Sequence, residues 1–426
     1  MTTLAQPVNT KSYSENVLNY SWYVLGLLTM VYALNFLDRT LIYILFTPIK
    51  KELALSDLQL ALLGSTSFVI FYTLLGIPFG RLADRTIRKN LIAIGLTIWS
   101  LFSGLTGYAE SFWGIFLCRV MVGVGEATLG PAALSLLSDF FPVRMRATVQ
   151  AIYSAGIPLG GGVAFFLGGW IGDSLGWRWA FYLLGFPGLL VALFVFLLKE
   201  PIRGQTEKNV VAYQSGDWKR LLSSKALRFH HIGYALFSLA GYSLTIWGPS
   251  FFSRVHGLSI TTIGLLAGIL SIIGGVPGTI LGGYASDWFR KKGPGGRMRF
   301  TAYGAICCIP LWLLLLYSNN IILLIGANLF LLGAGLIWLG PAAADVHDIA
   351  GPQLRGLGIG VYFFTVNIIG YGFGPPIVGK INDLMSVSTT PSQMKYSLLI
   401  CPLACALSAL FLWLGSKTME KEGALN

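Results

Sequence analysis

The sequence contains little charge for its length. Of its 426 residues, 11% are Asp, Glu, Lys or Arg, and 54% are hydrophobic. Soluble domains carry about 25% charged residues, and a chain with so few could not cover its surface with groups that water solvates. This shortage excludes an ordinary soluble domain and indicates a protein that lies in a lipid bilayer.

Groups for metal, redox or nucleotide chemistry are also scarce. The GxxxxGK[ST] pattern of a nucleotide-binding loop is absent, so nothing indicates the use of ATP. No convergent nucleophile and no histidine box is found, and we therefore expect no enzyme, no metal site and no organic cofactor. The cysteines all fall within apolar runs, which indicates no disulfide framework; they are Cys118, Cys307, Cys308, Cys401 and Cys405.

Long apolar segments recur along the whole chain. A helix needs about 20 apolar residues to span a bilayer, and the hydrophobicity here is continuous, unlike the alternation of an outer-membrane barrel. The predicted fold class is therefore an all-α membrane protein with twelve transmembrane helices. The predicted spans are residues 22–45, 58–80, 90–109, 112–136, 147–170, 178–198, 228–252, 262–284, 300–317, 320–345, 354–379 and 396–415.

The excess of basic residues is distributed unevenly about these spans. The formal net charge is +12, and with both termini inside, 22 Lys and Arg lie on the inner side and six on the outer side. This asymmetry follows the positive-inside rule, so the charge reports topology, and we expect no nucleic-acid partner. Both termini are predicted to be cytoplasmic. The short tails favour a multi-pass protein of a bacterial inner membrane.

The chain carries an internal repeat. The pentapeptide LGPAA occurs at residues 129–133 and again at 339–343, and residues 80–89 and 283–292 share one spacing of glycine, aspartate and base. Two echoes at similar offsets predict two pseudo-symmetric six-helix bundles, with a binding site between them near the bilayer midplane. The predicted division is a cytoplasmic tail 1–20, a first bundle 21–198, a cytoplasmic linker 199–227, a second bundle 228–416 and a tail 417–426.

Sequence motifs resemble those of the major facilitator superfamily of secondary transporters. GRLADRTIRK at residues 80–89 is similar to its loop between spans 2 and 3, and Arg119–Glu126 to its fourth-span motif. Gly156–Gly162 and GWRWAF at residues 176–181 are similar to its fifth span and its entry to span 6. NFLDR at residues 35–39 resembles the Spinster-like lipid transporters within it. The resemblance implies rocking bundles, a lysophospholipid or sphingoid phosphate substrate, and proton coupling.

Four charged residues interrupt the predicted spans: Asp38, Arg39, Arg119 and Glu126. A charge at the centre of a spanning helix costs roughly 2.5–3.5 kcal/mol. Arg119 and Glu126 are seven residues apart and share one face of span 4. A static cluster of ion pairs is one explanation. We favour a functional role, because replacing a buried ion pair by apolar residues is often stabilising.

We hypothesise that Asp38 and Glu126 carry the coupling proton. A carboxyl group in a dry cavity exchanges its proton as the cavity opens and closes and as an arginine approaches or leaves. Arg119 would alternate between these carboxylates and an anionic headgroup, since a guanidinium can donate two hydrogen bonds to a phosphate. Arg39 is a second candidate for the headgroup site, with a purely structural role as the alternative.

The second half offers aromatic side chains where the first half has charges. A cavity with ionic groups on one wall and an apolar opposite wall suits an amphiphile, whose headgroup would face the first half and whose acyl chain the second. Packing inside the bundle is the alternative for each aromatic residue. The predicted substrate-binding residues of this half are Phe237, Tyr242, Trp247, Trp338, Tyr362 and Asn367.

Charged residues at the inner ends of both halves are candidate gates. The resemblance implies that they hold the halves together when the outer side is open, partly by placing an aspartate at a helix N-terminus, where the helix dipole favours an anion. The positive-inside rule alone would explain the bases but not the acids. The predicted gating residues are Asp84, Arg85, Arg88, Arg144, Arg146, Asp287 and Lys291.

Together these features favour a proton-coupled secondary transporter of amphiphilic lipids that works by alternating access, as a monomer in the bilayer. A proton-coupled exporter of amphiphilic drugs or organic anions on the same fold is the alternative, and dependence on a phosphate headgroup separates the two. A membrane-embedded lipid-modifying enzyme would need a nucleophile or a histidine box. A receptor or scaffold would not need mid-membrane acids and doubled gate motifs.

Overall fold

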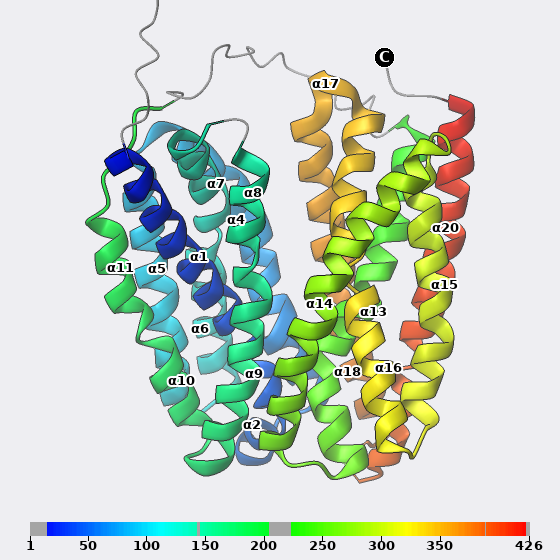
Figure 1. Cartoon of the computed structure of the whole chain (residues 1–426). Coiled ribbons are helices and arrows are strands. Elements are labelled where there is room, and N and C mark those ends of the chain that lie inside the picture. The colour runs from blue at the N-terminus through cyan, green and yellow to red at the C-terminus, as the bar shows by residue number, and fades with distance from the viewer. Residues whose placement is uncertain (1–14, 143–144, 204–222, 388, 423–426) are drawn as a thin grey trace, which may run out of the picture.

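Two helical bundles stand side by side in the computed structural model (Figure 1). The structure describes residues 15–142, 145–203, 223–387 and 389–422, and these form helices and turns without a strand. The first bundle contains α1 (Glu15–Ile44), α2 (Phe46–Leu53), α3 (Asp57–Ala61), the π-helix η1 (Leu62–Thr66), α4 (Ser67–Arg85), α5 (Arg88–Leu105), the 3₁₀-helix η2 (Thr106–Tyr108), α6 (Phe112–Glu126), α7 (Leu129–Phe140), α8 (Arg146–Ser154), α9 (Gly156–Ser174), α10 (Trp177–Gly185) and α11 (Gly188–Phe196).

The second bundle repeats this layout. It contains α13 (Lys225–His256), α14 (Ile260–Lys291), α15 (Gly296–Tyr317), α16 (Ile321–Ala334), α17 (Leu339–Thr365), the π-helix η4 (Val366–Phe373), α18 (Gly374–Leu384), the 3₁₀-helix η5 (Pro391–Gln393), α19 (Met394–Ser397) and α20 (Ile400–Glu422). The π-helices η1 and η4 lie in the second span of the first bundle and the fifth span of the second. They contact each other across the bundle interface.

Helices long and apolar enough to cross a bilayer account for most of the part that the structure describes. Eleven helical stretches meet both criteria, and they coincide with eleven of the twelve predicted spans. The remaining predicted span, residues 228–252, is α13, which has 32 residues, 20 of them buried. Because α13 is surrounded mainly by protein, it can carry buried serines that a lipid-facing helix would expose. The predicted all-α membrane fold is confirmed.

Polar caps fix where several of these helices begin. The hydroxyls of Ser224 and Ser259 accept hydrogen bonds from the third backbone N–H of α13 and α14. The Asn320 side chain accepts from two N–H groups at the start of α16, and Ser56 and Gln59 form a reciprocal capping box on α3. Such caps satisfy N–H groups that have no partner within the helix. They set the ends of the spans independently of hydrophobicity.

The ribbons of the two bundles diverge toward one end of the molecule (Figure 1). The helix α1 begins and α20 ends there, and we call this the inner end; α2 lies at the opposite, outer end. Near the outer end the bundles are bonded to each other. The Thr261 hydroxyl of α14 donates to Asp173 of α9 at 2.8 Å.

Close backbone contact between α9 and α14 brings the bundles together. A methyl group added at Gly264 would lie 2.2 Å from the carbonyl oxygen of Phe165, and one added at Gly169 would lie 2.7 Å from that of Ile260. No side chain fits at such distances. Small residues let membrane helices approach this closely, so glycines at these two positions permit the outer-end closure.

The predicted domain boundaries remain predictions. Parts of the two tails and of the linker, namely residues 1–14, 204–222 and 423–426, lie outside the described residues. Within the described chain, α11 ends at Phe196 and α13 begins at Lys225.

Enlarging Gly264 should loosen the outer-end contact. We expect Gly264→Val to lower the yield of a disulfide between D173C and T261C, introduced into a chain without native cysteines, because the new side chain would meet the Phe165 carbonyl. Gly283→Val is the matched control. Gly283 lies on the same helix as Gly264, and a Cβ added there would have no neighbouring atom within 4 Å. An unchanged yield in Gly264→Val would contradict this account of the closure.

A charged and aromatic cavity between the bundles

A cavity of about 240 Å³ lies between the two bundles. The first bundle lines it from α1, α4 and α9, and the second lines it mainly from α13, α14, α16, α17 and η4. Among its described lining residues, Arg39 is the charged one. The wall consists of Phe36, Arg39, Thr40, Tyr43, Phe68, Val69, Tyr72, Ile157, Pro158, Gly161, Phe165, Ser238, Gly241, Tyr242, Leu244, Thr245, Ser271, Gly275, Leu331, Leu332, Gly335, Leu336, Trp338, Leu339, Asn367 and Tyr371.

Arg39 is held against the cavity by an acid and by aromatic rings. Its Nε lies 2.5 Å from Oε2 of Glu126, and the side chains are 15% and 0% exposed. The guanidinium carbon lies 4.6 Å from the ring centre of Phe68 and 4.4 Å from that of Tyr72. Cation–π contacts of this kind strengthen when water is excluded. The rings therefore keep the cation at the wall of the cavity without neutralising it.

Glu126 reaches the cavity only through this arginine. The residue is 1% exposed, and its second carboxylate oxygen, Oε1, has no hydrogen-bond partner among the described residues. A buried carboxylate that loses its cation is costly unless it takes a proton. In this conformation Arg39 is therefore the cation that is bonded to the buried Glu126 carboxylate.

Arg119 lies behind the cavity wall rather than on it. It is 2% exposed, and it donates from Nε to the carbonyl of Leu63 at 3.2 Å and from Nη1 to the carbonyl of Asp38 at 3.0 Å. Its Nη2 has no partner among the described residues. In this conformation Arg119 thus binds main-chain oxygens instead of the carboxylates. Its predicted alternation with a headgroup stays a prediction.

Asp38 is likewise buried, at 2% exposed. Its Oδ1 accepts a hydrogen bond from the Ser103 hydroxyl of α5 at 2.5 Å. The structure thus gathers all four predicted intramembrane charges on α1 and α6, with Ser103 added. The serine could not be recognised from the sequence, because a hydroxyl in an apolar helix most often bonds to its own backbone.

The predicted aromatic and amide residues separate into two groups. Tyr242, Trp338 and Asn367 line the cavity, and Trp338 donates its indole N–H to the Gly335 carbonyl at 2.7 Å. Phe237, Trp247 and Tyr362 are buried outside that lining. Contact between these three and a ligand would require another conformation, and their role stays a prediction.

Two tyrosines that line the cavity join the bundles. The hydroxyls of Tyr43 and Tyr371 are hydrogen-bonded to each other, and Tyr371 also reaches the Gly64 carbonyl at 3.3 Å. Nearby, the Thr66 hydroxyl donates to the Gly372 carbonyl at 2.9 Å. These bonds link η1 to η4, and π-helical turns free carbonyls that an α-helix would use. The sequence does not single out Tyr43 as a cavity residue. Its place four residues after Arg39, on the same helix face, is the signal that indicates it.

A second set of bonds, which we call the outer gate, closes the outer end; it comprises Asp57, Arg254, Lys50 and Asp383. Arg254 of α13 lies 2.7 Å from Asp57, which also pairs with Lys50. The Asp383 carboxylate of α18 accepts from the backbone N–H groups of Asp57 and Leu58, at 2.8 and 2.9 Å. A carboxylate at a helix N-terminus is favoured by the free N–H groups and the helix dipole. The bonds to Arg254 and Asp383 join one bundle to the other, whereas the pair of Asp57 with Lys50 lies within the first bundle.

The predicted inner gating residues bond within their own bundles. Arg88 lies 2.5 Å from Asp139 in the first bundle. In the second, Arg297 lies 2.9 Å from Asp348 and from Asp287. Arg88 and Asp139 each precede their counterparts, Arg297 and Asp348, by 209 positions, so the internal repeat is also a repeat of ion pairs.

The other predicted gating residues are less informative. Asp84, Arg85 and Lys291 are exposed at the inner end. Arg144 and the side chain of Arg146 lie outside the described residues. Whether any of these residues joins the bundles in another conformation stays a prediction.

Comparison with known families identifies the fold. The sequence profile of the Major Facilitator Superfamily matches residues 28–375, most of the chain. The chain belongs to the Major Facilitator Superfamily. It is therefore a multi-pass membrane transporter of this superfamily, as the motifs predicted.

Individual relatives confirm the predicted likeness to Spinster. The sphingosine-1-phosphate transporter SPNS2 of Xenopus tropicalis is 26% identical, over 91% of this chain and 80% of its own length. An MFS-type efflux pump of Mycolicibacterium smegmatis is 28% identical over 94% of both chains. The crystal structure of a bacterial homologue of the human lysosomal transporter Spinster, inward-facing and unoccupied, has 28% identity and a TM-score of 0.82, covering 94% of this chain and 98% of that one.

The ion pair between Arg39 and Glu126 should be energetically coupled. Removing one partner of a buried pair costs about 3–5 kcal/mol because it strands the other charge, whereas replacing both with apolar residues costs much less. We therefore expect E126L alone to lower the free energy of unfolding in detergent more than the double variant R39M/E126L does. A double variant as destabilised as the sum of the two single variants would show that the pair does not interact.

Proposed function

We propose that this chain is a proton-coupled transporter of amphiphilic lipids that carry a phosphate headgroup, such as a lysophospholipid or a sphingoid phosphate. The observation that carries the proposal is the composition of the cavity wall: Arg39 on one side and uncharged, largely apolar residues on the other. An amphiphile matches both sides at once. An ordinary polar solute would leave the apolar wall without a partner.

Arg39 is the group that would receive the headgroup. Its guanidinium faces the cavity, and its Nε is bonded to Glu126. A phosphate can take this place, since arginine binds phosphate through two parallel hydrogen bonds. The displaced Glu126 would remain buried without a bonded cation, although Arg119 acts on it electrostatically, and it would take up a proton. Headgroup binding and proton binding would thereby be linked through one side chain.

Asp38 would serve as a second proton site. Its carboxylate accepts a hydrogen bond from the Ser103 hydroxyl, and Asp38 directly precedes Arg39 in the chain. A hydroxyl can donate to the ionised form and accept from the protonated form, so this contact tolerates both states. We assign the main coupling step to Glu126 because Glu126 is bonded to the cavity-lining arginine.

Alternating access would exchange the outer gate for the inner ion pairs. In the present conformation the bond between Asp57 and Arg254 crosses between the bundles, while Arg88 and Arg297 are satisfied within their own bundles. Rocking of one bundle against the other would break the first set and bring the inner ends together. The π-helices η1 and η4 would adapt at the midplane, where they contact each other.

An exporter of amphiphilic drugs is the second candidate. The Mycolicibacterium smegmatis relative is an MFS-type efflux pump, and the cavity wall is mostly apolar and aromatic. Such a wall binds many amphiphiles through their rings and chains. The two candidates differ in whether a phosphate is required.

The test uses the purified protein in liposomes that enclose a pH-sensitive dye. After a proton gradient is imposed, we expect a lysophospholipid or a sphingoid phosphate to trigger proton movement, and we expect Glu126→Gln to abolish it. Glu110→Gln is the matched control, because Glu110 is an exposed residue of the same bundle. The E110Q variant should retain the activity of the parent chain.

The outcomes separate the candidates. Proton movement with an amphiphilic drug that lacks phosphate, and none with either lipid, would move the substrate to the second candidate. Full activity in Glu126→Gln would remove this residue from the coupling step. No movement with any compound would contradict proton coupling.

A further inference from the structure

A second, smaller cavity opens beside the central one, and we call it the side pocket. Its volume is about 60 Å³. Besides Phe165 of α9, its walls come from the second bundle. They are formed by Phe165, Leu244, Thr245, Gly248, Pro249, Phe252, Leu258, Ile263, Leu266, Ala267, Leu270, Ser271, Ile321, Ile325, Asn328 and Leu332.

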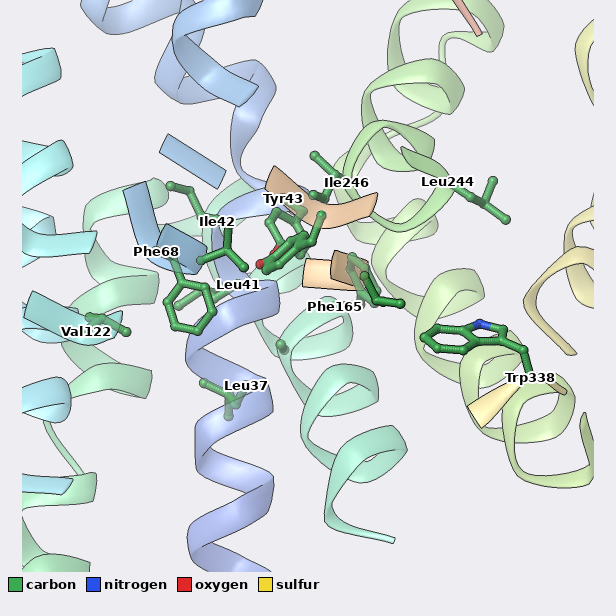
Figure 2. Packing of buried hydrophobic residues seen from close by; sticks show 14 of the residues in the cluster. Leu37, Leu41, Ile42, Tyr43, Phe68, Val122, Phe165, Leu244, Ile246 and Trp338 are labelled. Atoms are coloured by element: carbon green, nitrogen blue, oxygen red, sulfur yellow. The ribbon is translucent and has the colours of Figure 1, made fainter. Parts of the chain in front are cut away.

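The side pocket is a continuation of the central cavity. The residues that line both are Phe165, Leu244, Thr245, Ser271 and Leu332. Figure 2 shows Phe165 of the first bundle next to the part of the second bundle that carries Leu244 and Trp338. The two spaces therefore adjoin each other, and the shared residues lie between them.

Three helices place the side pocket nearer the outer end than the central cavity. On α13, which runs outward, the central cavity uses positions 238–245 and the side pocket 244–252. On α14, which runs inward, the side pocket uses positions 263–271 and the central cavity 271–275. On α16, which also runs inward, the side pocket uses positions 321–332 and the central cavity uses positions 331 and 332. The two spaces thus form one path along the bundle.

The chemistry of the side pocket excludes a headgroup. No charged residue is among its described lining residues. Its polar side chains are those of Thr245, Ser271 and Asn328, and Thr245 already donates to the Gly241 carbonyl at 3.1 Å. The other side chains of its wall are apolar, and such walls bind the apolar part of a ligand. The matching ligand is therefore a hydrocarbon chain.

The length of the path fits one acyl chain. Positions 238 and 252 of α13 mark its two ends, and at 1.5 Å per residue they are about 21 Å apart. Half of the hydrocarbon core of a bilayer is about 15 Å thick, so the path can take the whole tail of a membrane lipid. The narrow side pocket has room for a single chain.

From these observations we infer that the side pocket binds the distal end of the single acyl chain of the transported lipid and makes the transporter selective for long tails. The inference rests on the function proposed above, because it presumes a lipid whose phosphate lies at Arg39. It adds a site that determines which tails are transported, namely a single chain that is long enough to extend past Ser271 and Leu332.

The test narrows the entrance of the side pocket and compares lipids whose tails differ in length. Ser271→Phe places a ring between the two spaces, and transport of palmitoyl and octanoyl lysophospholipids with one phosphate headgroup is then compared in liposomes. At equal free concentration in water, each buried methylene strengthens binding by a factor of about four, so two of them already give roughly a tenfold preference. We expect the parent chain to prefer the palmitoyl lipid at least that strongly. Ser271→Phe should lose the preference while still transporting the octanoyl lipid.

Two further variants guard against a general defect. Ile273→Phe adds the same ring two residues away, at a position that is 57% exposed and outside both cavities, and it should behave as the parent. Leu332→Phe narrows the same entrance from α16 and should reproduce the effect of Ser271→Phe if that variant fails to fold.

Distinct results would overturn the inference and the proposed function. If the parent transports both tails equally, or if both entrance variants keep the palmitoyl preference, the side pocket does not bind the tail, although lipid transport stands. If the entrance variants slow both lipids equally, the same conclusion holds. If the parent transports neither lipid and moves a drug without phosphate, the proposed function fails, and the inference fails with it.

Discussion

The structure depends on one ion pair placed where water is scarce. Arg39 and Glu126 lie 2.5 Å apart between α1 and α6, with the acid buried and the base at the cavity wall. Neither charge would be tolerated alone at this depth. Under the proposed function the pair would have two alternatives, which are to remain bonded or to exchange the bond for a ligand anion and a proton. A coupled transporter requires two such states.

The rest of the structure holds the two bundles together around that pair. Glycines of α9 and α14 let the bundles meet near the outer end, and Asp57 with Arg254 holds them there. At the inner end, Arg88 and Arg297 repeat one ion pair in each bundle. The internal repeat thus gives the two bundles similar charged ends, which the proposed rocking of one bundle against the other would bring together.

Much of the fold could be predicted from the sequence. Continuous hydrophobicity predicts the spans, because each must match the thickness of a bilayer, and charge asymmetry predicts their direction. The predicted spans include α13, although its serines make it less apolar than its neighbour α14. The four intramembrane charges can also be predicted from the sequence, because a charged residue interrupts an otherwise apolar run.

The partners of those charges could not be predicted. Sequence reasoning assigned the headgroup first to Arg119, but the rotation of α6 and the carbonyl of Leu63 at the π-helix η1 place Arg119 behind the wall. The outer gate depends on Asp383 meeting the N-terminus of α3, more than 300 residues earlier in the chain. Local patterns contain no information on such contacts, because they arise only when the bundles pack.

The proposed function requires that a phosphate headgroup replace Glu126 at Arg39 and that Glu126 then take a proton. Titration of the purified protein with a lysophospholipid, in weakly buffered detergent with a pH indicator, tests this directly. We expect uptake of about one proton for each lipid bound, because a buried carboxylate without its bonded cation favours the protonated form. Lipid binding without proton uptake, or proton uptake that persists in Glu126→Gln, would contradict it.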